Sequence, residues 1–283
     1  MSLSRVFILG SLFFWWVGGM GSFAWASSVE NNSLTSQTRI VINIPARSLS
    51  LYDHGELIQK FPIAVGSSTY KTPMGRRELN QIVWNPWWIP PDSAWAKDEK
   101  KTPPGPKNPL GPVKMELGDS IRIHGTNKEK SVGTAASHGC MRMFNEDAKK
   151  LAWWIQTHFS DKTNPALQEK YKAHPGQSFY VILNQTIPVN IVYEPFEIDG
   201  GSLVIHPDVY GRVEKVREKA LQWLAKQGID SKVLNEEVFE AFVLGVNTRQ
   251  SFVVRLKDLV PGEWRNVETR IASKSNTGQQ GPL

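Results

Sequence analysis

Proline limits most strongly what this chain can fold into, because eight of its 18 prolines lie between Pro86 and Pro112. Each proline removes a backbone donor and is excluded from helix interiors and central strands. We therefore predict one long loop from Asn85 to Pro112. Loops of this length inside a compact domain are usually lids or binding loops, so we expect this one to cover a functional cleft.

Strand-like segments lie on both sides of this loop, and they indicate a mainly-β fold. They are rich in β-branched and apolar residues and occur at 39–44, 49–52, 57–65, 120–123 and 179–183. The turn Asp53-His54-Gly55 is typical of a hairpin. One helix is predicted at 145–158, with Asn145 as its N-cap residue. These segments define a main domain over 39–187.

The character of the sequence changes after Pro188 and predicts a small α/β extension over 188–272. Strands are expected at 189–193, 203–206 and 252–256, and helices from Asp208 to Gln227 and over 231–244. An acidic or amide residue before a helix and a glycine after it are common boundaries. The polar tail at 273–283 is predicted to be disordered.

The first 26 residues have the pattern of a secretory signal peptide. Arg5 precedes the apolar run Val6–Trp16, and the segment ends in Ala24-Trp25-Ala26. The apolar run is short for a membrane span and is followed by three glycines. We therefore predict export, cleavage after Ala26, a short linker at 27–38 and no stable membrane anchor.

Cys140 is the only cysteine of the chain, which excludes intramolecular disulfides, Cys-rich zinc sites and iron–sulfur clusters. A lone cysteine in an exported protein is either buried and inert or kept for its chemistry. His124 lies 16 residues before it and Arg142 two residues after it. A histidine and a positive charge favour the reactive thiolate. The amides around Gly139 and Cys140 can form an oxyanion hole.

Three other interpretations of this cluster remain open. His124, His138 and Cys140 would supply the three protein ligands of a catalytic zinc, although the sequence does not require a carboxylate near them. The cysteine could be an inert core residue, although glycines and histidines form a poor apolar shell. The domain could be a degenerate, non-catalytic scaffold, although every group that the chemistry needs is present. We expect no metal and no cofactor.

The motif residues resemble those of a known family. Ile-His-Gly-Thr at 123–126 followed by Ser-His-Gly-Cys-Met-Arg at 137–142 resembles the core of the L,D-transpeptidase catalytic domain, also called the YkuD domain. Further segments similar to the family are its strand at 61–66, its Thr-Pro-x-Gly turn at 72–75, and the ErfK-type loop at 85–91 and 104–111. The resemblance covers about 39–184.

The resemblance implies a YkuD-type β-sandwich with the cysteine at the mouth of a cleft. It also implies a periplasmic enzyme of peptidoglycan biosynthesis, cell wall organisation and cell shape, and a target of carbapenems. Cys140 would attack the diaminopimelate–D-Ala bond of a donor tetrapeptide stem and release D-Ala. The thioester would then pass its acyl group to an amine of a second stem or of an envelope lipoprotein. With water as acceptor, the same cysteine would make an L,D-carboxypeptidase or a peptidoglycan–lipoprotein hydrolase.

The family motif also implies roles for the residues around the cysteine. His124 would be the base, oriented by the Gly125 carbonyl. His138 would shape the cleft and the oxyanion region together with the amides of Gly139 and Cys140.

The remaining candidates are supporting or substrate-contacting residues. Ser137 and Arg142 would hold the motif loop, or Arg142 would bind a substrate carboxylate. Trp84, Trp87, Trp88 and Trp95 could line the cleft as substrate contacts, with core packing as the alternative. Tyr70 and Lys71 could contact the donor stem, with a solvated turn as the alternative. The formal charge of +6 is mild for 283 residues, and no nucleic-acid-binding motif is present, so we expect no nucleic-acid partner.

Overall fold

The computed structural model describes residues 38–246, 249–267 and 269. All of them lie in the unit Thr35–Leu283. The expected signal peptide (1–26), the linker (27–38) apart from Thr38, and the polar tail (273–283) lie outside the described residues. These three expectations stay predictions.

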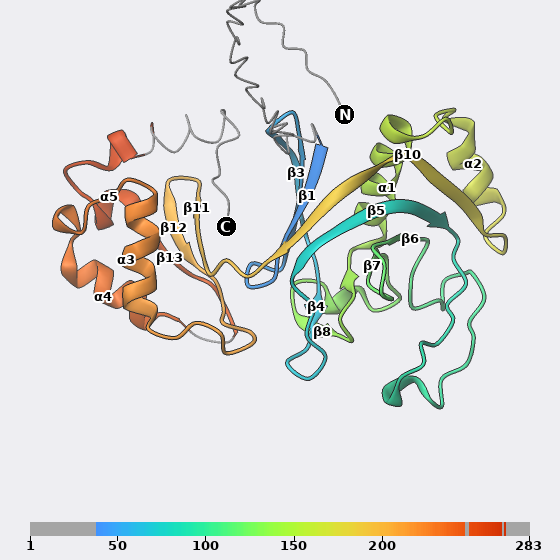
Figure 1. The fold of residues 1–283 in the computed structure, drawn as a ribbon, viewed down its shortest axis with the longest axis horizontal. Coiled ribbons are helices and arrows are strands. Elements are labelled where there is room, and N and C mark those ends of the chain that lie inside the picture. Colours follow the sequence, from blue (N-terminus) through green and yellow to red (C-terminus); the bar gives the residue numbers. More distant parts are fainter. Residues whose placement is uncertain (1–37, 247–248, 268, 270–283) are drawn as a thin grey trace, which may run out of the picture. The chain divides into compact units, whose positions relative to one another are not determined.

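An eight-stranded sheet forms the main part of the described chain (Figure 1). Its order is β3-β2-β1-β10-β5-β6-β7-β9, in which the pairs β1–β10 and β7–β9 are parallel and the others antiparallel. The strands are β1 (Thr38–Asn43), β2 (Ser48–Asp53), β3 (Glu56–Pro62), β5 (Gly75–Trp84), β6 (Val113–Glu116), β7 (Arg122–His124), β9 (Met141–Arg142) and β10 (Phe179–Val192). The short strands β4 (Val65–Gly66) and β8 (Ala135–Ser137) pair in parallel with each other.

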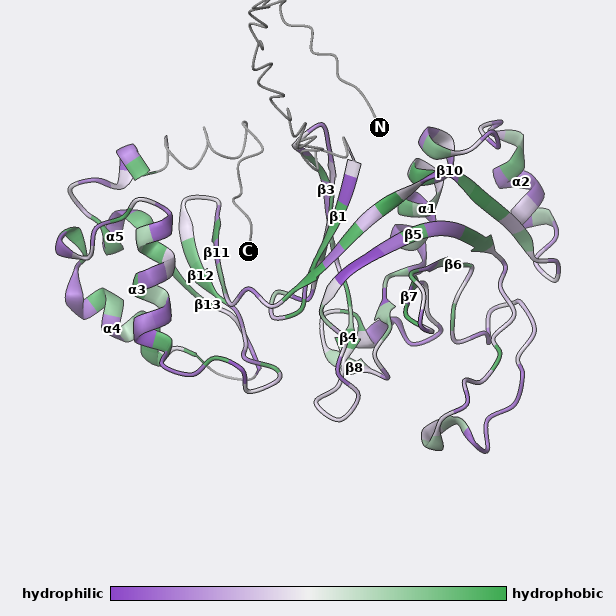
Figure 2. Ribbon diagram, in the orientation of Figure 1, coloured by the Kyte–Doolittle hydropathy of each residue, from purple (hydrophilic) through white to green (hydrophobic). Residues whose placement is uncertain are grey.

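The long strands β5 and β10 are curved and pair over most of their length (Figure 1). The first half of β5 is polar and mostly exposed, whereas Ile82, Val83 and Trp84 at its end are buried; Figure 2 shows this change of hydropathy along the strand. The pairing register shifts between Ile182 and Ile187. A bulge of this kind bends the strand and increases its twist.

The predicted boundary between 187 and 188 falls inside β10, because the strand continues through Pro188 to Val192. Its second half pairs with β1 and β5, so the residues assigned to the start of the extension belong to the main sheet. Proline interrupted the strand pattern in the sequence, but it lies in the middle of this strand. Burial of Val189 and Ile191 in the core stabilises the continued pairing.

Helix α1 (Asn145–Phe159) packs against the sheet through Ala148, Leu151, Ala152 and Ile155, which share one face at helical spacing. The N-cap residue is Phe144, not Asn145 as predicted. The Asn145 side chain instead accepts the Thr126 N–H at 2.8 Å and donates to the Thr126 carbonyl at 2.9 Å. A tertiary contact thus replaces the local cap. Helix α2 (Ala166–Ala173) follows and had no predicted counterpart.

The C-terminal residues form a second hydrophobic cluster around Phe239 and Phe242. It contains the three-stranded sheet of β11 (Phe196–Asp199), β12 (Ser202–Ile205) and β13 (Phe252–Arg255), and it includes the helices α3 (Val216–Lys226), α4 (Glu236–Leu244) and α5 (Leu256–Leu259). Helix α3 begins at Val216 and not directly after Asp208, because the Asp208 carboxylate accepts the N–H groups of Arg212 and Val213 and closes a turn.

The expected class, mainly β with a small α/β extension, is confirmed. Among the described residues, no helix is both long enough and apolar enough to cross a membrane.

Candidate active site

Cys140 and His124 line one cavity of about 730 Å³. The register of the parallel strands β7 and β9 brings them together: Ile123 pairs with Met141 and His124 with Arg142. Cys140 therefore directly precedes a strand whose neighbour ends at His124. The other motif residues on the cavity wall are Ser137, His138 and Arg142. The structure thus brings the predicted nucleophile and the predicted base to the same cavity.

Two hydroxyl groups hold the backbone of residues 137–140, which we call the cysteine loop. The Ser137 hydroxyl donates to the Cys140 carbonyl at 2.6 Å and accepts the Gly139 N–H at 3.1 Å. The Thr72 hydroxyl donates to the Gly139 carbonyl at 2.9 Å. Gly139 has φ of +109°, a conformation that L side chains rarely adopt, so only glycine fits here without strain.

These contacts bear on the predicted oxyanion hole. The Gly139 amide already donates to Ser137, whereas no acceptor among the described residues pairs with the Cys140 amide. The Cys140 amide is therefore the better candidate donor for an oxyanion.

The hydrogen bond of His124 defines its tautomer. The imidazole is buried, and Nδ1 lies 2.5 Å from the Gly125 carbonyl oxygen. A carbonyl can only accept, so Nδ1 carries the proton and Nε2 of the neutral ring carries the lone pair. Gly125 also needs to be small, because a Cβ there would lie 2.4 Å from Asn145 Oδ1. The geometry leaves Nε2 free to accept a proton.

Burial keeps both groups uncharged at neutral pH. Burial lowers the pKa of His124 to about 3; its bond to Gly125 opposes this shift, and the charges of Arg142, Arg122 and Lys114 add to it. Burial also raises the pKa of the Cys140 thiol, and the nearby Arg122 charge opposes that shift. The resting site is thus a neutral thiol beside a neutral imidazole, and not a preformed ion pair.

This charge state predicts the pH dependence of thiol alkylation. Because the thiol pKa is raised, the thiolate fraction is small at pH 7 and grows as pH rises past the usual cysteine value of about 8.5. The rate of iodoacetamide labelling, measured by mass spectrometry, is expected to keep rising through that pH. Cys140→Ala supplies the blank, since no other cysteine exists. A labelling rate that levels off below pH 7 would reveal a thiolate–imidazolium pair and contradict this charge state.

A strained turn beside the cysteine was not predicted. Gly118, Asp119 and Ser120 all have positive φ, which is uncommon for the two residues that carry side chains. The turn places the Ser120 carbonyl where it accepts a hydrogen bond from Cys140 Sγ at 3.4 Å. Ser120 therefore orients the thiol through its backbone, which no side-chain motif could reveal.

His138 is held between two aromatic rings. Trp95 stacks on it with ring centroids 3.9 Å apart and planes 11° apart, and the Tyr70 ring lies 4.7 Å away on a tilted plane. Trp95 reaches His138 from the proline-rich loop and lines the cavity.

Of the candidate substrate contacts, the structure places some on the cavity wall and others outside it. Trp88 is 8% exposed, lines the cavity and exchanges backbone hydrogen bonds with Thr102. Trp87 is 40% exposed with the Lys101 ammonium 4.6 Å from its ring, and neither it nor Tyr70 is part of the cavity wall. The Tyr70 ring nevertheless contacts His138, which does line the cavity.

Arg142 holds the motif region from within the cavity wall. Its guanidinium donates to the Ala136 carbonyl at 3.3 Å and to the Ser131 hydroxyl at 3.4 Å. Its backbone N–H and carbonyl both bond to Ala64. Arg122, which the sequence analysis did not single out, also lines the cavity and is paired with Glu116 at 3.0 Å.

Tyr210 connects the cysteine loop to a distant part of the chain. Its hydroxyl accepts the Thr72 N–H at 3.0 Å and donates to the Gly66 carbonyl at 2.8 Å, and all three residues are buried. Thr72 in turn bonds to Gly139, directly before Cys140. A sequence separation of 138 residues hides this contact between Tyr210 and Thr72 from any local pattern.

Replacing Tyr210 by phenylalanine should weaken this support. The change leaves two buried backbone groups without a partner, which costs about 1–3 kcal/mol. We expect a loss of that size in urea unfolding, together with slower carbapenem acylation of Cys140. Tyr180→Phe is the matched control, because Tyr180 is 55% exposed. Equal stability and acylation rates in the two variants would show that Tyr210 does not support the loop.

The proline-rich loop forms much of the cavity wall and is held from inside by Asn108. This fully buried side chain donates from Nδ2 to the carbonyls of Pro86, Thr102 and Pro103 at 2.8, 3.2 and 3.0 Å, and its Oδ1 accepts the Leu110 N–H at 2.9 Å. Because prolines cannot donate, one side-chain amide supplies the donors that this loop lacks.

Asn108→Asp should therefore release the loop. A carboxylate of the same shape has no hydrogen to offer and would face three carbonyl oxygens, at a cost of about 1–3 kcal/mol or more. We expect faster protease cleavage within 86–112 and a raised KM for the donor, with a smaller effect on the thermal transition. Asn164→Asp is the control, because this exposed side chain lies outside the loop and its Oδ1, which an aspartate keeps, accepts the Ala166 N–H. Cleavage no faster than in the control would contradict the role of Asn108.

The zinc interpretation finds no support in the geometry. Within the described ranges, no group of three or more His, Cys, Asp or Glu side chains is placed to hold a metal ion.

Comparison with known proteins matches residues 37–210 to the YkuD family, described as the L,D-transpeptidase catalytic domain. The YkuD protein of Bacillus licheniformis is 33% identical over 122 residues, which span 43% of this chain and 62% of that protein. The ErfK/SrfK protein of Salmonella typhimurium and the YbiS protein of Escherichia coli, both named as probable L,D-transpeptidases, are 31% and 32% identical; these matches span 41% and 40% of this chain and the same shares of those proteins.

A solved L,D-transpeptidase structure from Mycobacterium smegmatis overlaps with 55% of this chain and 58% of its own, at 16% identity and a TM-score of 0.35. At that score the overlap adds nothing to the assignment, which rests on the sequence match. The matched residues 37–210 make up more than half of the chain and contain the whole cavity wall described above. The chain belongs to the YkuD family of L,D-transpeptidase catalytic domains.

Proposed function

We propose that this protein is an exported peptidoglycan L,D-transpeptidase whose nucleophile is Cys140 and whose base is His124. The observation that carries the proposal is that the only thiol and a neutral imidazole line the same cavity, the imidazole having Nε2 unprotonated. Family membership supplies the reaction class, and the donor is a tetrapeptide stem.

In the acylation step, Sγ of Cys140 attacks the carbonyl carbon between diaminopimelate and D-Ala. The thiol proton passes to Nε2 of His124, which donates it to the departing D-Ala amine as the C–N bond breaks. The developing oxyanion accepts the Cys140 N–H. A thioester and a free D-Ala result.

In the second step, an amine attacks the thioester carbonyl and gives its proton to His124. The C–S bond breaks, an amide forms, and the proton returns to the thiolate. The amine belongs to a second stem, which gives a 3-3 cross-link, or to an envelope lipoprotein. Arg142 supports this reaction by holding the segment around Ala136, and the proposed location is the periplasm.

Purified protein incubated with disaccharide-tetrapeptide tests the proposal by mass spectrometry. Free D-Ala together with a cross-linked dimer is expected. Free tripeptide without any dimer, even with added lysine-type amines, would replace the transferase by an L,D-carboxypeptidase. No release of D-Ala would overturn both activities.

A further inference from the structure

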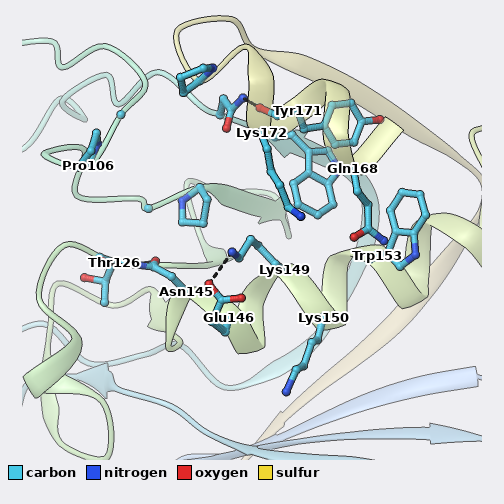
Figure 3. A pocket seen from close by; sticks show the side chains of 16 residues that line it. Pro106, Thr126, Asn145, Glu146, Lys149, Lys150, Trp153, Gln168, Tyr171 and Lys172 are labelled. Carbon is cyan, nitrogen blue, oxygen red and sulfur yellow. Dashed lines mark hydrogen bonds and ion pairs between the residues drawn. The ribbon is translucent and has the colours of Figure 1, made fainter. Parts of the chain in front are cut away.

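A second pocket of about 660 Å³ lies between α1, α2 and the proline-rich loop (Figure 3). We call it the lysine pocket, since Lys149, Lys150 and Lys172 line it. Cys140 and His124 line the other cavity and not this one. We infer that the lysine pocket binds a carboxylate-bearing glycopeptide of the cell wall, other than the donor stem that reacts at Cys140. This inference rests on the function proposed above.

The charges of the pocket suit a carboxylate. Lys149 extends from α1 and Lys172 from α2 toward the same space (Figure 3). Lys149 pairs with Glu146 at 2.5 Å, and Lys172 pairs with Glu169, outside the pocket wall, at 2.8 Å. The wall thus carries three lysines and one glutamate. An ammonium has three donors, so each paired lysine can still bind a ligand oxygen.

The rest of the wall suits a sugar ring. Trp84 and Tyr171 are buried and stacked with centroids 5.0 Å apart, and they line the pocket together with Pro112. Trp153 is half-buried and lies at one end, beside Gln168 (Figure 3). Aromatic and proline surfaces with a few polar groups are typical of ligand pockets. An N-acetyl sugar that carries a peptide with free carboxylates combines the two features that the wall recognises.

The strip 105–112 contributes residues to the walls of both the lysine pocket and the Cys140 cavity. Within the strip 105–112, Pro106 and Gly111 line the lysine pocket, whereas Lys107 and Leu110 line the Cys140 cavity. The strip is packed closely against the start of α1, since a Cβ on Gly111 would lie 2.3 Å from Asn145 Oδ1. One polymer can therefore contact both sides of this strip, with its reacting stem in one pocket and a neighbouring sugar–peptide unit in the other.

The test uses the full chain with Cys140 acylated by a carbapenem, so that the Cys140 cavity is filled. Disaccharide-tripeptide, which has no D-Ala to release, is titrated by calorimetry. We expect binding of one equivalent and a loss of at least about tenfold in affinity in the Lys149→Gln/Lys172→Gln variant. The control variant Lys170→Gln/Lys257→Gln removes the same charge from exposed lysines that do not line the pocket. This variant should bind disaccharide-tripeptide as tightly as the wild type.

A second variant separates the sugar contact from the charge contact. Trp153→Ala should weaken binding of the disaccharide-tripeptide, and the disaccharide without its peptide should bind more weakly than the whole probe. The inference is overturned if disaccharide-tripeptide does not bind to the acylated protein. It is also overturned if the two double lysine variants bind this probe with equal affinity, or if the protein binds the disaccharide as tightly as the disaccharide-tripeptide. Release of D-Ala by the unacylated protein is measured separately, so failure of the proposed function is seen independently.

Discussion

Replacing Cys140 by alanine is expected to abolish the release of D-Ala from disaccharide-tetrapeptide. The variant loses the only thiol of the chain, so no thioester can form and no other cysteine can take over. Cys140→Ser should also be close to inactive, because a hydroxyl is far harder to deprotonate than a thiol. Both variants should stay folded, since the hydrogen bond from Sγ to the Ser120 carbonyl is long, at 3.4 Å.

The measurement is D-Ala release by mass spectrometry, with circular dichroism to check the fold. Ser137→Ala is a useful comparison, because it perturbs the same loop and leaves the thiol in place. It should lower the rate without abolishing it. Folded Cys140→Ala protein that releases D-Ala at the wild-type rate would overturn the proposed function as a whole.

Replacing His124, the proposed base, should impair the release of D-Ala in a different way. His124→Gln keeps an N–H donor within reach of the Gly125 carbonyl but has no basic nitrogen, and His124→Ala removes both. General-base loss typically costs about 10²–10⁴-fold, so we expect weak but measurable turnover in His124→Gln. His158→Gln, at an exposed histidine of α1, is the control and should be fully active.

The pH profile distinguishes loss of the base from structural damage. In the wild type, His124 has a pKa of about 3 and stays unprotonated above about pH 5, while the thiol keeps its proton. The rate should therefore change little between pH 5 and 8. Residual activity of His124→Gln should instead rise with pH, because hydroxide must generate the thiolate. A flat profile in the variant would argue against His124 as the base.

The sequence offered candidate residues for the chemistry of the site, but it did not predict the contacts that hold them in place. Cys140, His124 and Gly139 could be identified because their residue types and their spacing are required locally: a thiol, an imidazole at a strand end, and a glycine at positive φ. The proline-rich loop was also predictable, since proline forbids regular structure wherever it occurs in such number. It does line the Cys140 cavity.

Contacts between distant segments could not be predicted in this way. Asn145 was expected to cap its own helix, but its amide binds Thr126, because the strand that ends at His124 lies beside α1 only in the folded chain. Pro188 was taken as a boundary, although core burial on both sides of it continues the strand. Local propensity is weak compared with such burial.

By itself, the sequence determined the mainly-β class and the family, and it singled out Cys140 and His124 as the candidate nucleophile and base, because these depend on residue types at short spacing. Only the tertiary structure decided the charge state of the site, since the pKa of His124 depends on burial and on charges from three separate strands. It also decided that Tyr210 and Thr72 hold the cysteine loop and that a lysine-lined pocket lies behind the proline-rich strip. Desolvation and long-range hydrogen bonding exist only once the chain is packed.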